Sequence, residues 1–138
     1  MSAGYSGTPL IRKLGMKEGA RVRVIDAPRG YRALLGTLPR GVKWGRNAGH
    51  GPYDFVHWFT RESTGLAERL RELKRRIEPN GMIWVSWPKR ASKVQTEVTE
   101  DAVRAAALRV GLVDVKVCAV DETWSGLKLV IPLKERTR

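Results

Sequence analysis

Residues 81–90 read Gly-Met-Ile-Trp-Val-Ser-Trp-Pro-Lys-Arg, and they predict the central strand of a sheet. Met82 to Trp87 is an apolar run of β-branched and aromatic residues that is too short for a helix. A run of this kind is typical of a strand covered on both faces. Pro88 ends the strand because proline has no N–H to donate to a neighbouring strand. Lys89 and Arg90 follow at once, so the strand opens into a basic loop, where an open α/β sheet usually has its ligand crevice.

The chain has 138 residues, which predicts a single domain spanning residues 1–138 with one hydrophobic core. No apolar run approaches the roughly 20 residues of a membrane span, and the first residues lack the features of a secretory signal. The lone Cys118 excludes an internal disulfide, and no metal-ligand spacing surrounds it. We therefore expect a cytoplasmic protein without a membrane partner or a metal, with mobile ends at residues 1–8 and 134–138.

The net charge of +12 is unevenly distributed along the chain. Residues 1–46 carry ten Lys or Arg and two acids, whereas residues 97–122 carry six acids and three bases. A strongly basic surface attracts phosphates, polyanions or an acidic partner. The alternative interpretation is a well-solvated surface that has no cognate polyanion.

Strands alternate with helices along the chain. Thr8-Pro9 is typical of a helix start, and Thr99 with Glu100 and Asp101 is typical of another. The predicted strands are 21–26, 42–44, 53–60, 82–87, 113–120 and 127–133. Helices are predicted at 10–14, 31–35 and 99–110. A longer helix between the third and fourth strands has Leu66, Leu70, Leu73 and Ile77 on its buried face.

The connections are predicted from glycine, proline and capping residues. Thr60 or Ser63 caps the middle helix, and Pro79-Asn80-Gly81 forms a turn into the central strand. Residues 45–52 contain three glycines and form a flexible loop, and residues 89–98 form a polar loop. The resulting fold class is a three-layer, Rossmann-like α/β domain. Its mostly parallel sheet has about six strands in the spatial order 2-1-3-4-6-5 and ends in an antiparallel strand.

Three segments resemble the core of class I S-adenosylmethionine-dependent methyltransferases. Leu14 to Val22 resembles the approach to that family's first strand, and Tyr53-Asp54-Phe55-Val56 resembles its Asp-containing strand before the middle helix. Leu66 through Trp87 resembles the helix, turn and strand that follow. The resemblance implies a methyltransferase-like sheet and S-adenosylmethionine as a cofactor to consider.

A second resemblance covers nearly the whole chain. The opening Met1 to Leu10, the segment Trp87-Pro88-Lys89 and the long segment Val113 to Lys128 resemble a small family of uncharacterised bacterial domains. That family brings no established activity with it.

The sequence departs from methyltransferases at the cofactor turn. In those enzymes a glycine-rich turn after the first strand lets the backbone approach the cofactor. Here Asp26-Ala27-Pro28-Arg29-Gly30 follows the first strand, and Pro28 has neither the conformational freedom nor the N–H of glycine. No acid follows Val42-Lys43-Trp44 to hold ribose hydroxyls. We expect no cofactor, because Pro28 and Arg29 disfavour S-adenosylmethionine.

Loops that follow parallel strands meet at one edge of the sheet, which defines a candidate ligand site. The ligand-binding candidates are Asp26, Arg29, Tyr31, Lys89, Arg90, Asp121, Glu122 and Trp124, with Thr60, Arg61, Trp87 and Ser92 at the same edge. Cations and aromatic rings in a crevice recognise an anionic or planar ligand. The alternative is that Arg29 or Lys89 pairs with Asp121 or Glu122 in a structural ion-pair network.

The sequence contains no convincing catalytic group. Asp121 and Glu122 are adjacent, so in an extended chain they face opposite ways and make a poor acid–base pair. His50 and His57 lack a serine or cysteine at a recognisable spacing, so we interpret both as structural or incidental. Cys118, Trp58, Trp84 and Trp87 are expected in the core. The sequence therefore favours a non-catalytic binding or regulatory domain for an anionic ligand or acidic protein. A methyltransferase and a nucleic-acid-binding protein remain alternatives.

Overall fold

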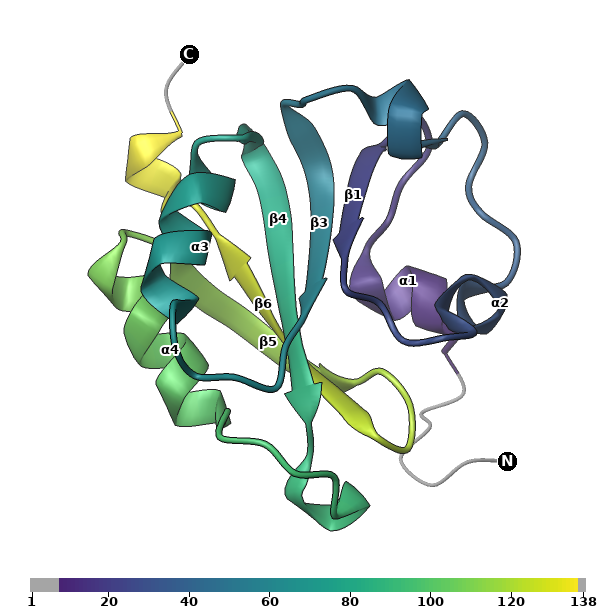
Figure 1. Cartoon of the computed structure of the whole chain (residues 1–138). Helices are drawn as coiled ribbons and strands as arrows, with labels where there is room; N and C mark the ends of the chain where they lie inside the picture. Colours follow the sequence, from purple (N-terminus) through teal and green to yellow (C-terminus); the bar gives the residue numbers. More distant parts are fainter. Residues whose placement is uncertain (1–7, 137–138) are drawn as a thin grey trace.

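The computed structural model describes residues 8–136, which form one six-stranded sheet with helices on both faces (Figure 1). Strands β1 (Arg21–Ile25), β2 (Lys43–Trp44), β3 (Tyr53–Phe59) and β4 (Ile77–Pro88) run parallel to one another. Strand β6 (Trp124–Val130) runs antiparallel to both β4 and β5 (Val113–Ala119). The spatial order is β2-β1-β3-β4-β6-β5. The predicted fold class and strand order are confirmed.

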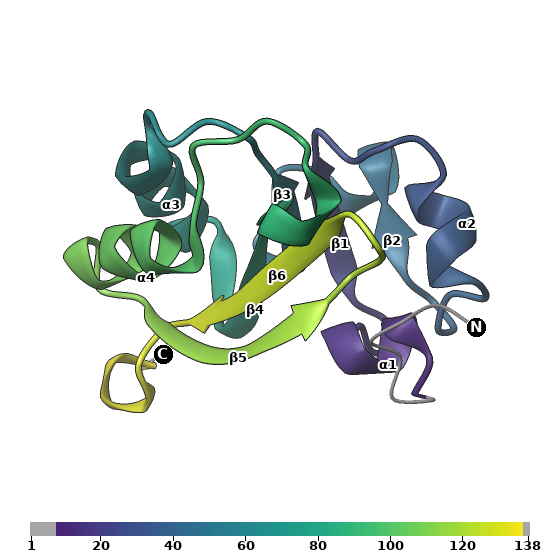
Figure 2. The same cartoon turned by 90° about the horizontal axis from the view of Figure 1, so that it is seen from below.

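Helices cover the sheet in separate layers, as Figure 2 shows from the carboxyl edge of the parallel strands. Helices α3 (Leu66–Lys74) and α4 (Glu100–Arg109) lie on one face, and α1 (Leu10–Leu14) lies on the other. Helix α2 (Tyr31–Leu35) packs with α1, next to β1 and β2. Two buried clusters result, one against α3 and α4 and one against α1 and α2.

Strand β4 is buried on both faces, as its composition predicts. Ile83 and Val85 pack toward α3 and α4, whereas Trp84 packs toward α1. The indole N–H of the fully buried Trp84 donates to the backbone oxygen of Leu14 at 2.8 Å. This bond satisfies the one polar group of the largest core side chain, since a buried donor without a partner is costly.

Strand β4 begins earlier than the sequence predicts. Ile77 is not a helical residue but the first residue of β4, paired with Tyr53. The predicted turn at Pro79-Asn80-Gly81 lies inside the strand, next to a register shift between Tyr53 and Phe55. A Cβ atom on Gly81 would lie 2.9 Å from the backbone oxygen of Tyr53. The glycine therefore permits close backbone approach in an irregular strand, instead of a turn.

Helix starts were predicted with mixed success. Thr99 caps α4, and its hydroxyl oxygen accepts a hydrogen bond from the Ala102 N–H at 3.1 Å, as expected. Helix α3 has no side-chain cap, because the preceding residue is Gly65 in a left-handed conformation. Thr60 instead accepts from the Glu62 N–H and forms a local turn. Helix α1 begins at Leu10, so Pro9 occupies the N-cap position and no side chain caps that helix.

Three segments expected to be irregular contain short 3-10 helices. Residues Gly45–Ala48 form η1, in which Ala48 is only 1% exposed, in place of the predicted flexible loop. Residues Arg90–Ser92 form η2. Leu133–Glu135 form η3, within a segment expected to be a mobile tail from residue 134, and the Arg136 side chain donates to the backbone oxygen of Ile131. Residues 1–7 and 137–138, also expected to be mobile, lie outside the described part.

Candidate functional site

Five of the predicted site residues lie in loops at the carboxyl edge of the parallel strands: Asp26, Arg29, Lys89, Asp121 and Glu122. Asp26 and Arg29 are exposed in the turn between β1 and α2. Lys89 follows β4, and its N–H donates to the backbone oxygen of Thr123 at 2.8 Å. That bond joins the end of β4 to the β5–β6 turn, where Pro88 pairs with Trp124. The structure thus brings the β4 loop and the β5–β6 turn together, as expected.

The alternative interpretation, an internal ion-pair network at this edge, is not seen in residues 8–136. Asp121 holds its own turn, because one carboxylate oxygen accepts from the Thr123 N–H at 2.8 Å and the Trp124 N–H at 2.7 Å. Glu122 is exposed. Within residues 8–136 neither acid forms an ion pair with Arg29 or Lys89. Asp121 is therefore a turn-forming residue, and the nearby cations have no internal counterion.

Tyr31 is a core residue, because its side chain is only 4% exposed. Its hydroxyl lies 2.7 Å from Nδ1 of His57, and Nε2 of His57 lies 2.8 Å from the Ser86 hydroxyl. Burial raises the pKa of Tyr31 above its usual value and lowers the pKa of His57 to about 3. His57 is thus a neutral imidazole that links α2, β3 and β4.

The sequence offered one signal for this network. His57 shares a strand face with Phe55 and Phe59, and a polar side chain on an apolar face needs hydrogen-bond partners. Which partners it finds could not be read from spacing, because Tyr31 and Ser86 lie 26 and 29 residues away.

A row of aromatic rings fills the carboxyl end of the α1/α2 core. Tyr31 meets Phe59 edge to face at 5.1 Å between ring centroids, and Phe59 meets Trp124 edge to face at 5.2 Å. Trp124 is half-buried by this packing. Its ring therefore contributes to the core as well as to the surface of the β5–β6 turn.

A hollow of about 480 Å³ lies beside the end of β4 and the start of α4. Trp87 and Pro88 contribute apolar surface to it, and Arg90 and Lys93 contribute positive charge. The remaining lining residues are Val94, Gln95, Thr96, Val98, Thr99 and Glu100. Arg90 was predicted for the site, whereas Lys93 was not. Lys93 has a φ of 62°, which is an uncommon backbone conformation for a residue with a side chain. Strained backbone of this kind is found more often at functional sites than elsewhere.

A neighbouring hollow of about 610 Å³ shares Gln95 and Thr96 with the first. It is also lined by Arg61, Glu62, Thr64 and Glu97. Glu97 is engaged, because its carboxylate accepts a hydrogen bond from the Ser63 hydroxyl at 3.2 Å. The two hollows together form a surface of mixed polarity on either side of residues 95–96.

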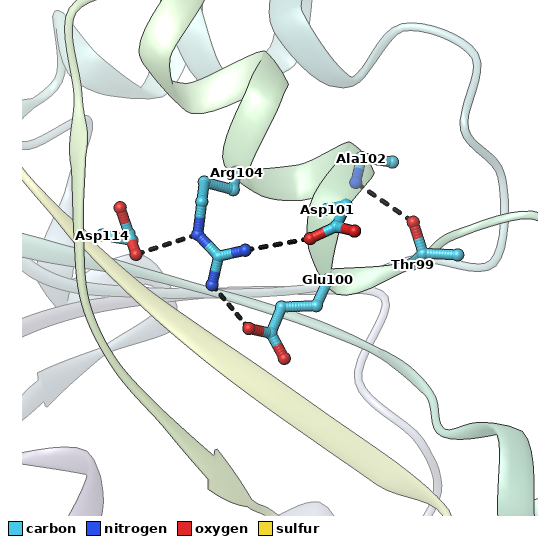
Figure 3. Close-up of polar contacts among 6 residues, drawn as sticks. All are labelled: Thr99, Glu100, Asp101, Ala102, Arg104 and Asp114. Carbon is cyan, nitrogen blue, oxygen red and sulfur yellow. Dashed lines mark hydrogen bonds and ion pairs between the residues drawn. The ribbon is translucent and has the colours of Figure 1, made fainter.

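Arg104 neutralises the acidic start of α4 (Figure 3). Its guanidinium pairs with Glu100 and Asp101 of the same helix and with Asp114 of β5. Glu100, the one acid lining the hollow beside β4, is thereby directed toward Arg104. The pairing holds the pKa of Asp114 below its ordinary value. Within residues 8–136, Arg90 and Lys93 have no carboxylate partner, so the hollow is cationic.

A smaller cavity of about 380 Å³ lies at the opposite, amino edge of the sheet, where no site was predicted. Lys17, Glu18, Asp54 and Asn80 contribute its polar groups. The Asp54 carboxylate accepts a hydrogen bond from the Arg21 N–H at 2.8 Å, so it holds the start of β1. Among residues 8–136, no group of three or more His, Cys, Asp or Glu could hold a metal ion, and no helix is both long and apolar enough to span a membrane.

Solved structures of methyltransferases share this fold. A S-adenosylmethionine-dependent methyltransferase from Aquifex aeolicus matches at 14% identity with a TM-score of 0.62, over 94% of this chain and 91% of its own. Aeropyrum pernix fibrillarin with bound S-adenosyl-L-methionine matches at 15% identity with a TM-score of 0.58, over 92% of this chain and 70% of its own. CcbJ methyltransferase from Streptomyces caelestis matches at 8% identity with a TM-score of 0.57, over 88% and 86%. At these identities the likeness concerns the fold.

Comparison at the level of sequence identifies a family for this chain, whereas the solved structures share only its fold. Among curated proteins, no relative matches this chain. The model of one protein family matches residues 52–133, which extend from the start of β3 to the end of β6 and beyond. The matched region includes β4, the hollow beside it and the Arg104 network. The chain therefore belongs to the family described as "Protein of unknown function (DUF3052)".

Proposed function

We propose that this protein is a non-catalytic binding domain on a reduced methyltransferase scaffold, and that it recognises an anionic group in the hollow beside β4. The observation that carries the proposal is the pair Arg90 and Lys93 over the apolar surface of Trp87 and Pro88. Two like charges at the rim of a concave site repel each other, and an anion relieves that repulsion. An arginine also offers charge-assisted hydrogen bonds to a phosphate or carboxylate.

The turn after β1 supports a binding role without S-adenosylmethionine. Pro28 offers no N–H in this turn, and Arg29 adds bulk and charge. Helix α2 has only five residues, and the side chain of its first residue, Tyr31, is committed to His57. Strand β2 has two residues and leads directly into η1. These features leave few groups to hold a nucleoside cofactor.

Backbone and side-chain amide spectra recorded during titration with inorganic phosphate, pyrophosphate and adenosine 5′-phosphate test the anion site. We expect saturable shifts at Arg90, Lys93 and the Trp87 indole. The variant Arg90→Ala/Lys93→Ala should lose these shifts, whereas the matched variant Arg71→Ala/Arg109→Ala, which removes equal charge from exposed helical positions, should retain them. Equal loss in both variants would mean that the anions follow net charge and not a site.

Calorimetry with S-adenosylmethionine and S-adenosylhomocysteine tests the enzymatic alternative. The reduced cofactor turn predicts no heat of binding at micromolar concentrations of either compound. Micromolar binding that Arg29→Ala alters would instead support a S-adenosylmethionine-dependent methyltransferase and contradict the non-catalytic proposal.

A further inference from the structure

One part of the sheet has no helix over it. In Figure 1, α3 and α4 lie in front of the half of the sheet that contains β4, β6 and β5, and β1 has no helix in front of it. The 3-10 helix η1 borders β1, and its Ala48 is buried in the cluster on this face. The side chains that β1 presents on this face are half-buried, and η1, in place of an α-helix, lies beside them.

The side of β1 that no α-helix covers is basic. Val22 and Val24 point into the α1/α2 core, so the alternation of the strand places Arg21, Arg23 and Ile25 on the opposite face. Lys43 of β2 pairs with Arg21 and shares its face, because laterally paired residues lie on the same side of a sheet. We call the surface formed by Arg21, Arg23, Lys43 and Arg69 the β1 face.

Two guanidinium groups of the β1 face lie over aromatic rings. The Arg23 guanidinium carbon is 6.0 Å from the centroid of the Tyr53 ring, and that of Arg69 is 5.5 Å from the centroid of the Trp58 ring. Each ring belongs to a side chain that is only 5% exposed, so the arginines cover the rings. Stacking fixes the plane of a guanidinium and leaves its N–H groups free to bind an oxyanion.

The acids beside Arg21 and Arg69 already have hydrogen-bond or ion-pair partners. Asp54 accepts the Arg21 backbone N–H, and Glu72 pairs with Arg76 at 3.7 Å. Within the described chain, no carboxylate forms an ion pair with any of the four cations of the β1 face. A further hollow of about 530 Å³, between the loop before β3 and the start of β4, is lined by His50, Arg75 and Arg76.

We infer that the β1 face binds the phosphodiester backbone of a nucleic acid. Arginine forks recognise phosphates bidentately, and Arg21 and Arg23 are spaced along the strand by about 6.6 Å, close to the spacing of phosphates in an extended strand. The net charge of +12 favours capture of a polyanion. Tyr53 and Trp58 are covered, so bases have no ring to stack on, and binding is independent of base sequence.

A nucleic acid fits this face better than an acidic protein. Stable protein interfaces usually have a desolvated core with aromatic or aliphatic anchors. On the β1 face the rings lie beneath guanidinium groups, and Ile25 is the one apolar residue that β1 itself contributes. Binding at this surface would therefore be driven by electrostatic attraction and not by burial of apolar area. The site is separate from the hollow beside β4 and does not depend on it.

Fluorescence anisotropy with a labelled 20-nucleotide oligo(dT), between 50 and 200 mM salt, tests the inference. Two lost phosphate contacts should reduce the salt slope by about 1.4 and weaken binding by about tenfold or more at 100 mM salt. The variant is Arg21→Gln/Arg23→Gln, and its control, Arg71→Gln/Arg109→Gln, removes the same charge elsewhere. We expect the control to lose about twofold or less in affinity for oligo(dT), since exposed charges far from the binding surface are largely screened.

Several results would overturn the inference. They are no binding of oligo(dT) at 50 mM salt, an equal loss in both variants, or preference for poly-glutamate over oligo(dT), which would assign the face to an acidic protein. If Arg21→Gln/Arg23→Gln unfolds, the other two cations of the β1 face, replaced in Lys43→Gln/Arg69→Gln, provide the same comparison. The Arg90→Ala/Lys93→Ala variant should also bind oligo(dT). Its fold-loss in affinity should be less than half of that of the β1-face variant. That result distinguishes failure here from failure of the anion site beside β4.

Discussion

The hydroxyl of Tyr31 lies 2.7 Å from Nδ1 of His57, among the buried apolar and aromatic side chains of the α1/α2 core. The second nitrogen of His57 is held by the Ser86 hydroxyl at 2.8 Å. No buried side-chain nitrogen or oxygen lacks a partner in residues 8–136. A fully satisfied network of this kind fixes the position of α2 against β3 and β4.

Removal of the tyrosine hydroxyl should destabilise the fold. In Tyr31→Phe the Nδ1 atom of His57 has no partner, and a buried polar group without a hydrogen bond costs about 1–3 kcal/mol. Urea denaturation should show a lower midpoint with an unchanged slope. The replacement Tyr53→Phe is the matched control, because the Tyr53 hydroxyl bonds at 3.0 Å to the backbone oxygen of Gly49 in a partly buried position. A loss no greater than that of the control would contradict an essential network.

His57 should make stability depend on pH. Its pKa is lowered to about 3 by burial, so the unfolded chain binds a proton that the folded chain excludes as pH falls below about 6.5. Stability is therefore full above about pH 6.5 and declines toward pH 3 by up to about 1.4 kcal/mol per pH unit. The measurement is the free energy of unfolding in urea between pH 7 and pH 4.5.

The histidine variants separate this effect from the titration of acids. His57→Phe is less stable at neutral pH because Tyr31 and Ser86 lose a partner, but its stability should fall less steeply with acid. His50→Gln, at an exposed position, should retain the slope of the original protein. Identical slopes in all three proteins would show that His57 is not excluded from protonation in the folded state.

Gly126 of β6 packs against Ser86 of the Tyr31–His57–Ser86 network, where only a residue without a side chain fits closely. A Cβ atom at this position would lie 3.1 Å from the Ser86 hydroxyl and 3.1 Å from the Trp84 ring. Gly126→Ala should therefore cost about 1–3 kcal/mol through overpacking, as measured by thermal or urea unfolding. The adjacent control Ser125→Ala removes no core contact and should change stability by roughly 0.5 kcal/mol or less. A stable Gly126→Ala protein would mean that Trp84 and Ser86 can shift without cost.

Arg104 joins α4 to β5, so its replacement should loosen that contact. Arg104→Gln removes three ion pairs and leaves the carboxylates of Glu100, Asp101 and Asp114 close together. We expect a lower melting temperature, with a difference that shrinks at high salt because exposed charges are screened. Asp101→Asn is the control, since its carboxylate is 96% exposed and should matter little. A difference that persists unchanged at 1 M salt would indicate lost packing in place of lost charge.

Much of the architecture could be predicted from the sequence because the deciding patterns are local. The apolar run Met82 to Trp87 indicated the central strand, and the alternation of strands with helices led to the order β2-β1-β3-β4-β6-β5. Thr99 indicated the start of α4 because a cap hydroxyl bonds to an N–H three residues away. The sequence also indicated a basic loop after β4, and Arg90 of that loop lines a hollow, which the other predicted ligand-binding residues do not line. In each case the interacting groups are close in sequence, or follow from a regular period.

The tertiary structure decided which distant groups meet. Tyr31 lies in the core, where its hydroxyl bonds to His57. The Asp121 carboxylate accepts hydrogen bonds from the backbone of its own turn and does not pair with Arg29 or Lys89. Strand β4 extended through Pro79-Asn80-Gly81 because β3 was there to pair with it. The β1 face exists only because no α-helix lies in front of β1, the strand that carries Arg21 and Arg23, and no local pattern in the sequence predicts this. Backbone conformation depends on near neighbours, whereas burial, hydrogen-bond partners and exposed faces depend on which elements pack together.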